Sequence, residues 1–482
     1  MTSSEEDHFR IFFLPFMAPG HMIPTMDMAR LFATRGIKST IVTTPANTAF
    51  FTETIQLHSP NPGLEIDLLT MQFPYEAAGL PEGCENADSL NSPEMFYRFF
   101  KAIDLLQHPF ENLLEKFQPD CLIADHFVHW ANSVAGKFGI PCLIFHGSSY
   151  FSQCITNNLL RYEPYKNLSS DSDTFVVPGD FPDEIKFTKS ELSPYDKKEG
   201  PEFLIELMDK VEDATRASYG VIMNSFYELE SGYADYYEKV MGFKHWHIAP
   251  FSLHFDEGDN IEADHRGKKA SIDVNECKRW LDEKQDDSVL YVCLGSMSNV
   301  SDDQLHEIAI ALEALGQNFI LVVIVRREDT KEWVPQGFET RGLIIRGWAP
   351  QPMILNHRGV GGFVTHCGWN SILEGVVAGV PMVTWPHHAE QFYNEKLVTN
   401  VLKIGIQVGA TKWVPRVGEH DILISNKQIL NAMSRLLIGE EAQDMRRRAR
   451  EFKKMAMKAI SQGGSSWSHL NALVKELKAH KR

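Results

Sequence analysis

Basic side chains are scarce in this 482-residue sequence, which has 47 Lys and Arg against 64 Asp and Glu and a formal net charge of -17. A protein that binds nucleic acid or an anionic membrane needs a basic face to neutralise phosphates. The charge balance therefore argues against both partners. The run Arg446-Arg447-Arg448 is interpreted as an exposed helical face for the same reason.

Paired cysteine motifs and long apolar runs are also missing. The seven cysteines are an odd number without Cys-x-x-Cys spacing, which predicts neither a disulfide framework nor a cysteine-based zinc site. The opening MTSSEEDHFRIFFLPFMAPG carries acids where a secretory signal carries lysines, and Pro15 and Pro19 interrupt its short apolar run. We expect a cytoplasmic, monomeric protein with no integral membrane segment.

The length and the 43% hydrophobic content suit two globular domains. Short apolar runs alternate with segments of helical spacing, which is typical of parallel sheets covered by helices. These runs are 9–16, 40–44, 65–71, 121–124, 141–145 and 221–223 in the first half, and 289–294, 319–325, 343–345, 362–366 and 381–385 in the second. The predicted fold class is α/β, with two doubly wound Rossmann-like domains that face a cleft.

A polar stretch of mixed charge at 252–274 is typical of an exposed linker. It divides a first domain, 1–251, from a second domain, 275–462. The end of the chain, 463–482, is predicted to be a helix, because its leucines fall at helical spacing with lysines opposite them. We expect this helix to pack back on the first domain.

The most informative segment reads WAPQPMILNHRGVGGFVTHCGWNSILEGVVAGVPMVTWPHHAEQ, from Trp348 to Gln391. Inside it, a glycine-rich strand leads to a predicted helix N-terminus, where backbone N–H groups and Gly368 form a site for a diphosphate. Ser371 and Glu374 also have the spacing of a helix capping box, and these two residues alone leave both interpretations open. The dehydrogenase fingerprint is incomplete, because Val364 stands where its third glycine belongs.

The 44 residues of this segment resemble the signature of plant secondary-product glycosyltransferases, and the similarity extends to Gly20–Pro24 and Gly220–Phe226. The resemblance implies the two-Rossmann-domain, or GT-B, fold. It also implies inverting, metal-independent transfer of a sugar from a UDP-sugar to a hydroxyl of a small hydrophobic molecule. The phrase TWPHHAEQFYNEKLVTNVL resembles a branch known for triterpenoid and flavonoid acceptors.

The same resemblance assigns donor-site roles by position. Trp348 would stack on uracil, with the backbone of Ala349 on the base edge. The ribose, the phosphates and the sugar would be held by side chains suited to hydroxyls and anions: Gln351 and Glu374 for the ribose, His366, Asn370, Ser371 and Ser296 for the phosphates, and Trp369, Glu390 and Gln391 for the sugar.

An acceptor hydroxyl needs a base of near-neutral pKa, and His21 is the candidate because it follows the first predicted strand at the edge where doubly wound sheets bind ligands. Asp125 follows another strand to that edge and would orient the imidazole. Spacing alone equally allows Asp125 to cap a helix over 126–135. The family resemblance favours the catalytic role.

The acceptor pocket is expected in the first domain, lined by apolar and aromatic side chains that suit a terpenoid or phenolic skeleton: Phe16, Met17, Met95, Phe96, Phe127, Tyr150 and His388. Neither a metal nor another cofactor is expected. Asp171-x-Asp173 lies in a polar loop, and His126-x-x-His129 lacks further ligands at suitable spacing.

Glucose is the predicted sugar, because in this family an acid followed by Gln, here Glu390 and Gln391, usually faces glucose hydroxyls. His387 and His388 depart from the small or apolar residues that are usual before Ala389. This departure keeps UDP-glucuronate and UDP-galactose open as donors, and the acceptor could already carry a sugar, as a saponin does. The alternatives in other classes are a non-catalytic UDP-sugar-binding protein and a nucleotide-dependent dehydrogenase.

Overall fold

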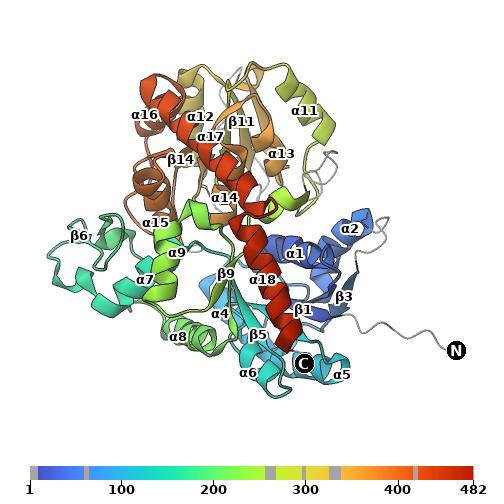
Figure 1. Cartoon of the computed structure of the whole chain (residues 1–482). Helices are drawn as coiled ribbons and strands as arrows, with labels where there is room; N and C mark the ends of the chain where they lie inside the picture. Colours follow the sequence, from blue (N-terminus) through green and yellow to red (C-terminus); the bar gives the residue numbers. More distant parts are fainter. Residues whose placement is uncertain are drawn as a thin grey trace.

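The computed structural model describes residues 9–58, 65–255, 267–295, 300–324, 338–415 and 422–480, and Figure 1 shows their arrangement in two α/β halves. In the first half, seven strands form a parallel sheet in the order β3-β2-β1-β4-β5-β8-β9. The strands are β1 (Arg10–Leu14), β2 (Lys38–Thr43), β3 (Ile66–Thr70), β4 (Cys121–Asp125), β5 (Cys142–His146), β8 (Gly220–Met223) and β9 (His245–His247).

The helices of this half are α1 (Pro19–Ala33), α2 (Thr48–His58), α3 (Tyr75–Ala78), α4 (Pro93–Leu105), α5 (Gln107–Phe117), α6 (Ala131–Gly136), α7 (Tyr150–Tyr162), α8 (Glu202–Ala217) and α9 (Ser231–Lys239). A small antiparallel pair, β6 (Thr174–Val176) and β7 (Lys186–Thr188), lies between α7 and α8 in the chain. The first helix starts earlier than its apolar pattern indicates, at Pro19, so Pro24 is inside it.

The second half contains six parallel strands in the order β12-β11-β10-β13-β14-β15. They are β10 (Val289–Cys293), β11 (Asn318–Val323), β12 (Gly342–Arg346), β13 (Val360–Thr365), β14 (Met382–Thr384) and β15 (Gly405–Gln407). The helices are α11 (Val274–Asp282), α12 (Asp302–Leu315), α13 (Gln351–Asn356), α14 (Trp369–Ala378), α15 (Gln391–Lys396), α16 (Asn426–Leu437), α17 (Glu440–Ile460) and α18 (Ser465–His480). The predicted α/β class with two parallel sheets is confirmed.

The last helix, α18, runs from the second half across the first (Figure 1). Its Leu470, Leu473 and Leu477 are buried in the same apolar cluster as β1 and β4. A second cluster contains residues of both halves, among them Tyr150 and Trp369, so apolar packing is continuous between them.

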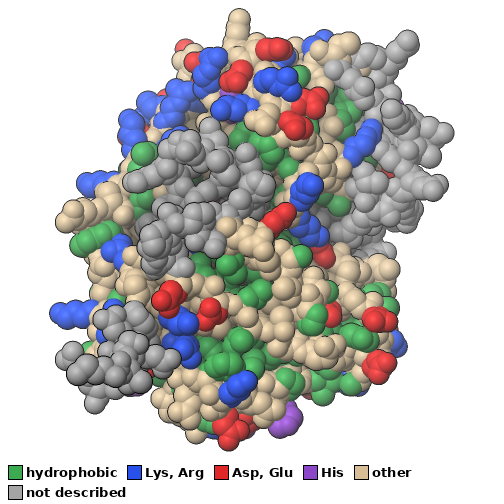
Figure 2. Space-filling model, turned by 90° about the vertical axis from the view of Figure 1, so that its right-hand side faces the viewer, with side chains coloured by type: hydrophobic (Ala, Val, Ile, Leu, Met, Phe, Trp, Pro, Cys, Tyr) green, Lys and Arg blue, Asp and Glu red, His purple; other side chains and the backbone are tan. Residues whose placement is uncertain are grey.

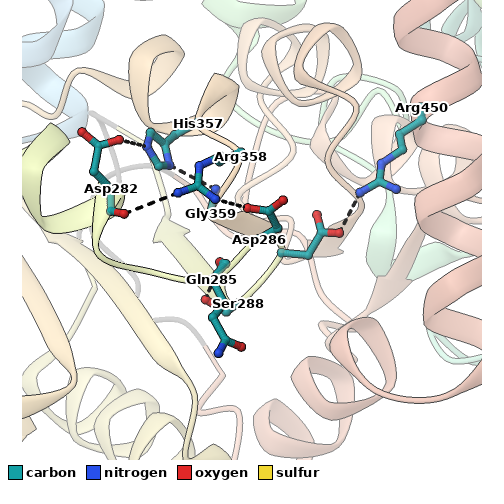
Figure 3. A network of polar contacts seen from close by, with 9 residues as sticks. Asp282, Gln285, Asp286, Ser288, His357, Arg358, Gly359 and Arg450 are labelled. Atoms are coloured by element: carbon teal, nitrogen blue, oxygen red, sulfur yellow. Dashed lines mark hydrogen bonds and ion pairs between the residues drawn. The ribbon is translucent and has the colours of Figure 1, made fainter.

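The amino ends of β10 and β13 are held by polar contacts, at the sheet edge opposite the start of α14 (Figure 3). His357 Nε2 lies 3.0 Å from Asp282 Oδ1, Arg358 pairs with Asp286, and Arg450 on α17 donates to Asp287 at 2.7 Å. Exposed pairs of this kind contribute little stability individually. What the network does is join α11 and α17 to the turns that precede β10 and β13.

The surface has mixed charge, and on the face in Figure 2 acidic and basic side chains are interspersed. The arginine run lies in α17, where Arg446 and Arg448 donate to the backbone carbonyls of Leu437 and Lys403. Arg447 is exposed, as expected for the run, whereas Arg446 and Arg448 are half-buried against these carbonyls. Among the described residues, no helix is long and apolar enough to cross a membrane.

Candidate active site

The centre of the site is a contact between His21, in the first turn of α1, and Asp125, the last residue of β4. Because β1 and β4 are parallel neighbours, with Leu14 opposite Ala124, the turn after β1 brings His21 over the end of β4. His21 Nδ1 lies 2.7 Å from Asp125 Oδ2. The carboxylate can only accept, so Nδ1 carries the proton and Nε2 remains available as a base.

The two partners shift each other's pKa in opposite directions. Burial alone would lower the pKa of His21, but the charge and hydrogen bond of Asp125 and the charge of Glu390 raise the pKa above its usual value. Burial works in the opposite sense on Asp125, yet the charges of His21 and His126 and the hydrogen bonds from His21 and the Phe127 N–H leave its pKa lowered. Asp125 is thus an anion that stabilises positive charge on the imidazole.

The helix-cap interpretation of Asp125 is wrong. The next helix, α6, begins only at Ala131 and has Trp130 as its N-cap residue. Asp125 Oδ1 instead accepts the N–H of Phe127 at 3.0 Å, inside a turn. This bond fixes the carboxylate and leaves its second oxygen for His21.

The two histidines of the His-x-x-His pair have different partners. His129 Nε2 lies 3.0 Å from Asp104 Oδ1, whereas His126 Nδ1 is 3.5 Å from Asp125 Oδ1. Among the described residues, His21, Asp125 and His126 are the group whose metal-type ligand atoms lie within 4.8 Å of one another. Asp173 is engaged elsewhere, because its Oδ2 accepts the N–H groups of Ser169 and Ser170.

Aromatic rings surround the candidate base. Phe16 and Phe127 have their ring centroids 5.3 and 5.6 Å from that of His21, and Phe100 stacks on Phe16 at 5.4 Å. Phe96 packs on Phe100 at 5.0 Å. Phe100 was not predicted, although it follows Phe96 at the helical spacing that places both on one face of α4.

The other expected pocket residues differ in their surroundings. Met95, Phe127 and His388 are half-buried, while Met17 is buried and its sulfur accepts the hydroxyl of Thr43. Tyr150 is fully buried in the core, with its ring against Tyr237 and its hydroxyl 3.4 Å from His247 Nδ1. The structure does not group Tyr150 with the rings around His21.

In the second half, Trp348 follows the end of β12 by two residues and is held by residues from the last part of the expected linker, 252–274. Its N–H donates to Ser271 Oγ at 2.9 Å, and its carbonyl accepts the Ser271 N–H at 2.8 Å. Gly267 approaches the indole so closely that a Cβ there would lie 2.6 Å from Cζ2, and its φ of +98° also requires glycine. Ala349 is half-buried beside it.

The residues expected at the ribose form one hydrogen-bonded group. Gln351 Nε2 donates to Ser371 Oγ at 3.1 Å and to Glu374 Oε2 at 2.7 Å, and its Oε1 accepts the hydroxyl of Tyr291 at 3.2 Å. The N-cap of α14 is Gly368, which places Ser371 inside the helix. The capping-box interpretation of Ser371 and Glu374 is therefore wrong.

His366 lies between two glycines at the start of α14. A Cβ at Gly295 or at Gly368 would come within 2.6 Å of its ring, so both glycines are needed for the ring to fit. Burial and the charge of His387 lower the pKa of His366 to about 3, which makes it a neutral donor. Ser296 lies outside the described residues.

Two turns at this site have non-glycine residues in the left-handed region, Cys367 with φ 64° and Ala389 with φ 52°. Such residues need support from their surroundings. Asn394, which is fully buried, donates to the Cys367 carbonyl at 3.0 Å and to Glu390 Oε1 at 3.3 Å. Its Oδ1 accepts the hydroxyl of Ser149 from the first half at 3.2 Å.

Comparison with known proteins agrees with this geometry. Residues 256–433 match the family model described as UDP-glucoronosyl and UDP-glucosyl transferase. The chain is 49% identical to a scopoletin glucosyltransferase of Nicotiana tabacum, with 98% of each chain covered. It is 50% identical to an anthocyanin 3'-O-beta-glucosyltransferase of Gentiana triflora, over 98% of this chain and 99% of the relative.

The chain belongs to the plant UDP-glycosyltransferase family. This membership removes the dehydrogenase alternative. The crystal structure of Glycyrrhiza uralensis UGT73P12 complexed with glycyrrhetinic acid 3-O-monoglucuronide superposes with a TM-score of 0.91 at 38% identity, covering 98% of this chain and 96% of that one. The GT-B fold implied by the resemblance is confirmed.

In this UDP-glycosyltransferase, the three residues expected at the sugar differ in burial. Trp369 is buried, and its indole N–H donates to the Asn224 carbonyl at 2.6 Å. Gln391 Oε1 accepts the N–H groups of His387 and His388 at 2.9 and 3.1 Å. Glu390 is half-buried, and its charge acts on His21 in the other half.

Trp348→Ala is expected to weaken binding of UDP and of UDP-glucose by the same factor, because a stacked base is common to both ligands and such stacking is worth about 1 to 3 kcal/mol. Titration calorimetry with each ligand measures this. Trp280→Ala is the matched control, because Trp280 is a half-buried indole on α11 that contacts Lys284. Unchanged UDP affinity in Trp348→Ala would mean that the indole only packs against Gly267.

Proposed function

We propose that this UDP-glycosyltransferase transfers glucose from UDP-glucose, with inversion and without a metal, to a hydroxyl of a small hydrophobic plant metabolite such as a flavonoid, a coumarin or a triterpenoid. The observation that carries the proposal is the buried Asp125 paired with His21, with the carboxylate of Glu390 acting on the same imidazole from the other half. Relatives named for scopoletin and anthocyanin support the acceptor class.

In this mechanism His21 Nε2 takes the proton of the acceptor hydroxyl. The hydroxyl oxygen forms a bond to C1 of glucose from the face opposite the diphosphate, and the bond from C1 to the UDP oxygen breaks. Asp125 stabilises the imidazolium that results. Backbone N–H donors at the N-terminus of α14, with neutral His366 beside them, stabilise the negative charge that develops on UDP.

We assign the acceptor pocket to residues 1–251, with Phe16, Met95, Phe96 and Phe127 as its walls, and the donor site to residues 275–462. Residues 252–274 are the linker between them. In the C-terminal segment 463–482, the helix α18 (Ser465–His480) belongs structurally to the first domain. Aromatic packing around His21 supports the first assignment, and the apolar contacts of α18 support the last. Monomeric state and cytoplasmic location stay predictions from the sequence.

UDP-glucose is expected to have a higher kcat/KM than UDP-galactose and UDP-glucuronate. The carboxylate of Glu390 can accept from vicinal hydroxyls but repels the carboxylate of glucuronate. A panel of flavonoid, coumarin and triterpenoid acceptors, analysed by mass spectrometry, tests donor and acceptor together.

Gln391→Ala should reduce the rate of glucose transfer in this assay more than it reduces the affinity for UDP. If UDP-glucuronate is the best donor, the glucose assignment is wrong and His388, the more accessible of the two histidines, is the first residue to replace.

Treatment with EDTA is expected to leave the rate unchanged, because the proposed chemistry uses His21 and helix N–H groups in place of a cation. The assay compares initial rates before and after chelation, with Mn²⁺ or Zn²⁺ added back. A rate that falls on chelation and returns with one cation would contradict metal independence. It would direct attention to the cluster of His21, Asp125 and His126.

A further inference from the structure

A proline inside α1 leaves one backbone carbonyl without its usual helical donor. Each interior residue of an α-helix donates its N–H to the carbonyl four residues earlier, and proline has no N–H. For Pro24 that carbonyl belongs to Gly20, the residue directly before His21. In the structure it accepts Nδ2 of Asn370, from the second half of the chain, at 2.7 Å.

Asn370 has a second partner that fixes its orientation. It is the second residue of α14, at the end of the helix assigned to the donor phosphates. Its Oδ1 accepts Nδ2 of Asn224 at 3.0 Å, and Asn224, which follows β8, accepts the indole N–H of Trp369 through its carbonyl. The two asparagines therefore connect α14 to both β8 and the first turn of α1.

We propose that Pro24 is a positioning residue for sugar transfer. By withholding its N–H, it reserves the Gly20 carbonyl for Asn370, and this bond sets the position of the helix that carries His21 relative to the helix that holds the donor. The inference rests on the proposed function. An interior proline otherwise weakens a helix, and the bond between the two halves gives this one a role that alanine cannot fill.

Pro24→Ala supplies the missing N–H and lets α1 reclaim the Gly20 carbonyl. Because small displacements of a catalytic group are costly, we expect kcat to fall roughly tenfold. The UDP dissociation constant should change less than kcat, because Pro24 itself is not among the residues assigned to the nucleotide. Pro24→Val also supplies the N–H while keeping more of the buried volume, and it should lose kcat to the same extent.

Pro19→Ala is the matched control. Pro19 is the first residue of the same helix, and the N–H that it lacks would have no helical partner in any case. Its replacement should leave kcat unchanged. Thermal unfolding of each variant checks that it is folded at the assay temperature.

A double-mutant cycle with Asn370→Ala gives the deciding measurement. If Pro24 acts through Asn370, Pro24→Ala should have little further effect on kcat in the Asn370→Ala background. Equal losses in both backgrounds, or losses that follow side-chain size in Pro24→Ala and Pro24→Val, would overturn the inference and leave Pro24 as a packing residue. If the wild-type protein transfers no sugar to any acceptor, the proposed function and this inference are both refuted. If the wild type is active and Pro24→Ala is equally active, the inference alone is refuted.

Discussion

His21→Ala should lower kcat by roughly a hundred- to ten-thousand-fold, the usual contribution of general base catalysis, and leave UDP affinity near the wild-type value. The reason is the division of the site. The imidazole stands on α1 beside Asp125, whereas the described groups assigned to UDP lie on α13 and α14 and in the loops that precede these two helices. Product formation under saturating donor and acceptor gives kcat, and calorimetry with UDP gives the affinity.

His129→Ala is the control for this substitution. His129 also pairs with an aspartate, Asp104, but that pair is separate from the rings around His21. The control should keep a near wild-type kcat. If His21→Ala keeps comparable turnover as well, His21 is not the base, and the acceptor hydroxyl must lose its proton to another group or to water.

The sequence predicts those parts of the fold that depend on residues near one another in the chain. Buried parallel strands are continuous apolar runs, so β1, β4, β10 and β13 are recognisable without long-range information. β9 is different, because its three residues include two histidines that are stabilised by packing from α18. A strand so short and polar takes its conformation from its neighbours.

The same distinction applies to the site. His21 and Asp125 could be paired in advance, because each follows a strand and the carboxyl ends of parallel strands meet at one edge. The contact of Gly267 with the Trp348 indole and the bond from Asn370 to Gly20 join segments far apart in the chain. No local pattern encodes such partners. The start of α1 was misplaced for a related reason, since proline is typical of a first helical turn and the bond from Asn370 to the Gly20 carbonyl cannot be foreseen from the sequence.

Asp125 illustrates how the structure decides between two interpretations of one residue. As a helix cap it would contribute stability and nothing to the chemistry. In the structure, α6 begins too late for that role, and both carboxylate oxygens are occupied by Phe127 N–H and His21 Nδ1. The residue is therefore assigned to the chemistry, and a substitution that preserves its shape can separate the two roles.

Asp125→Asn should slow turnover by roughly a hundred- to ten-thousand-fold without unfolding the protein. The amide is nearly isosteric and can still accept the Phe127 N–H, but it carries no charge to stabilise an imidazolium. Because the charge of Asp125 raises the pKa of His21, its removal should lower that pKa. The base must be neutral to accept a proton, so kcat/KM falls as pH drops through the His21 pKa. In Asp125→Asn this acidic limb should therefore move to lower pH.

Asp104→Asn provides the matched comparison, because it makes the same change at the Asp104 and His129 pair. It should alter neither kcat nor the position of the acidic limb. A pH profile of kcat/KM from each variant, together with thermal unfolding, separates the outcomes. If Asp125→Asn is unfolded, the carboxylate has a structural role after all. If it is folded and slow but its acidic limb has not moved, Asp125 orients the imidazole without changing its pKa. Glu390, whose charge also raises the His21 pKa, is then the residue that sets it.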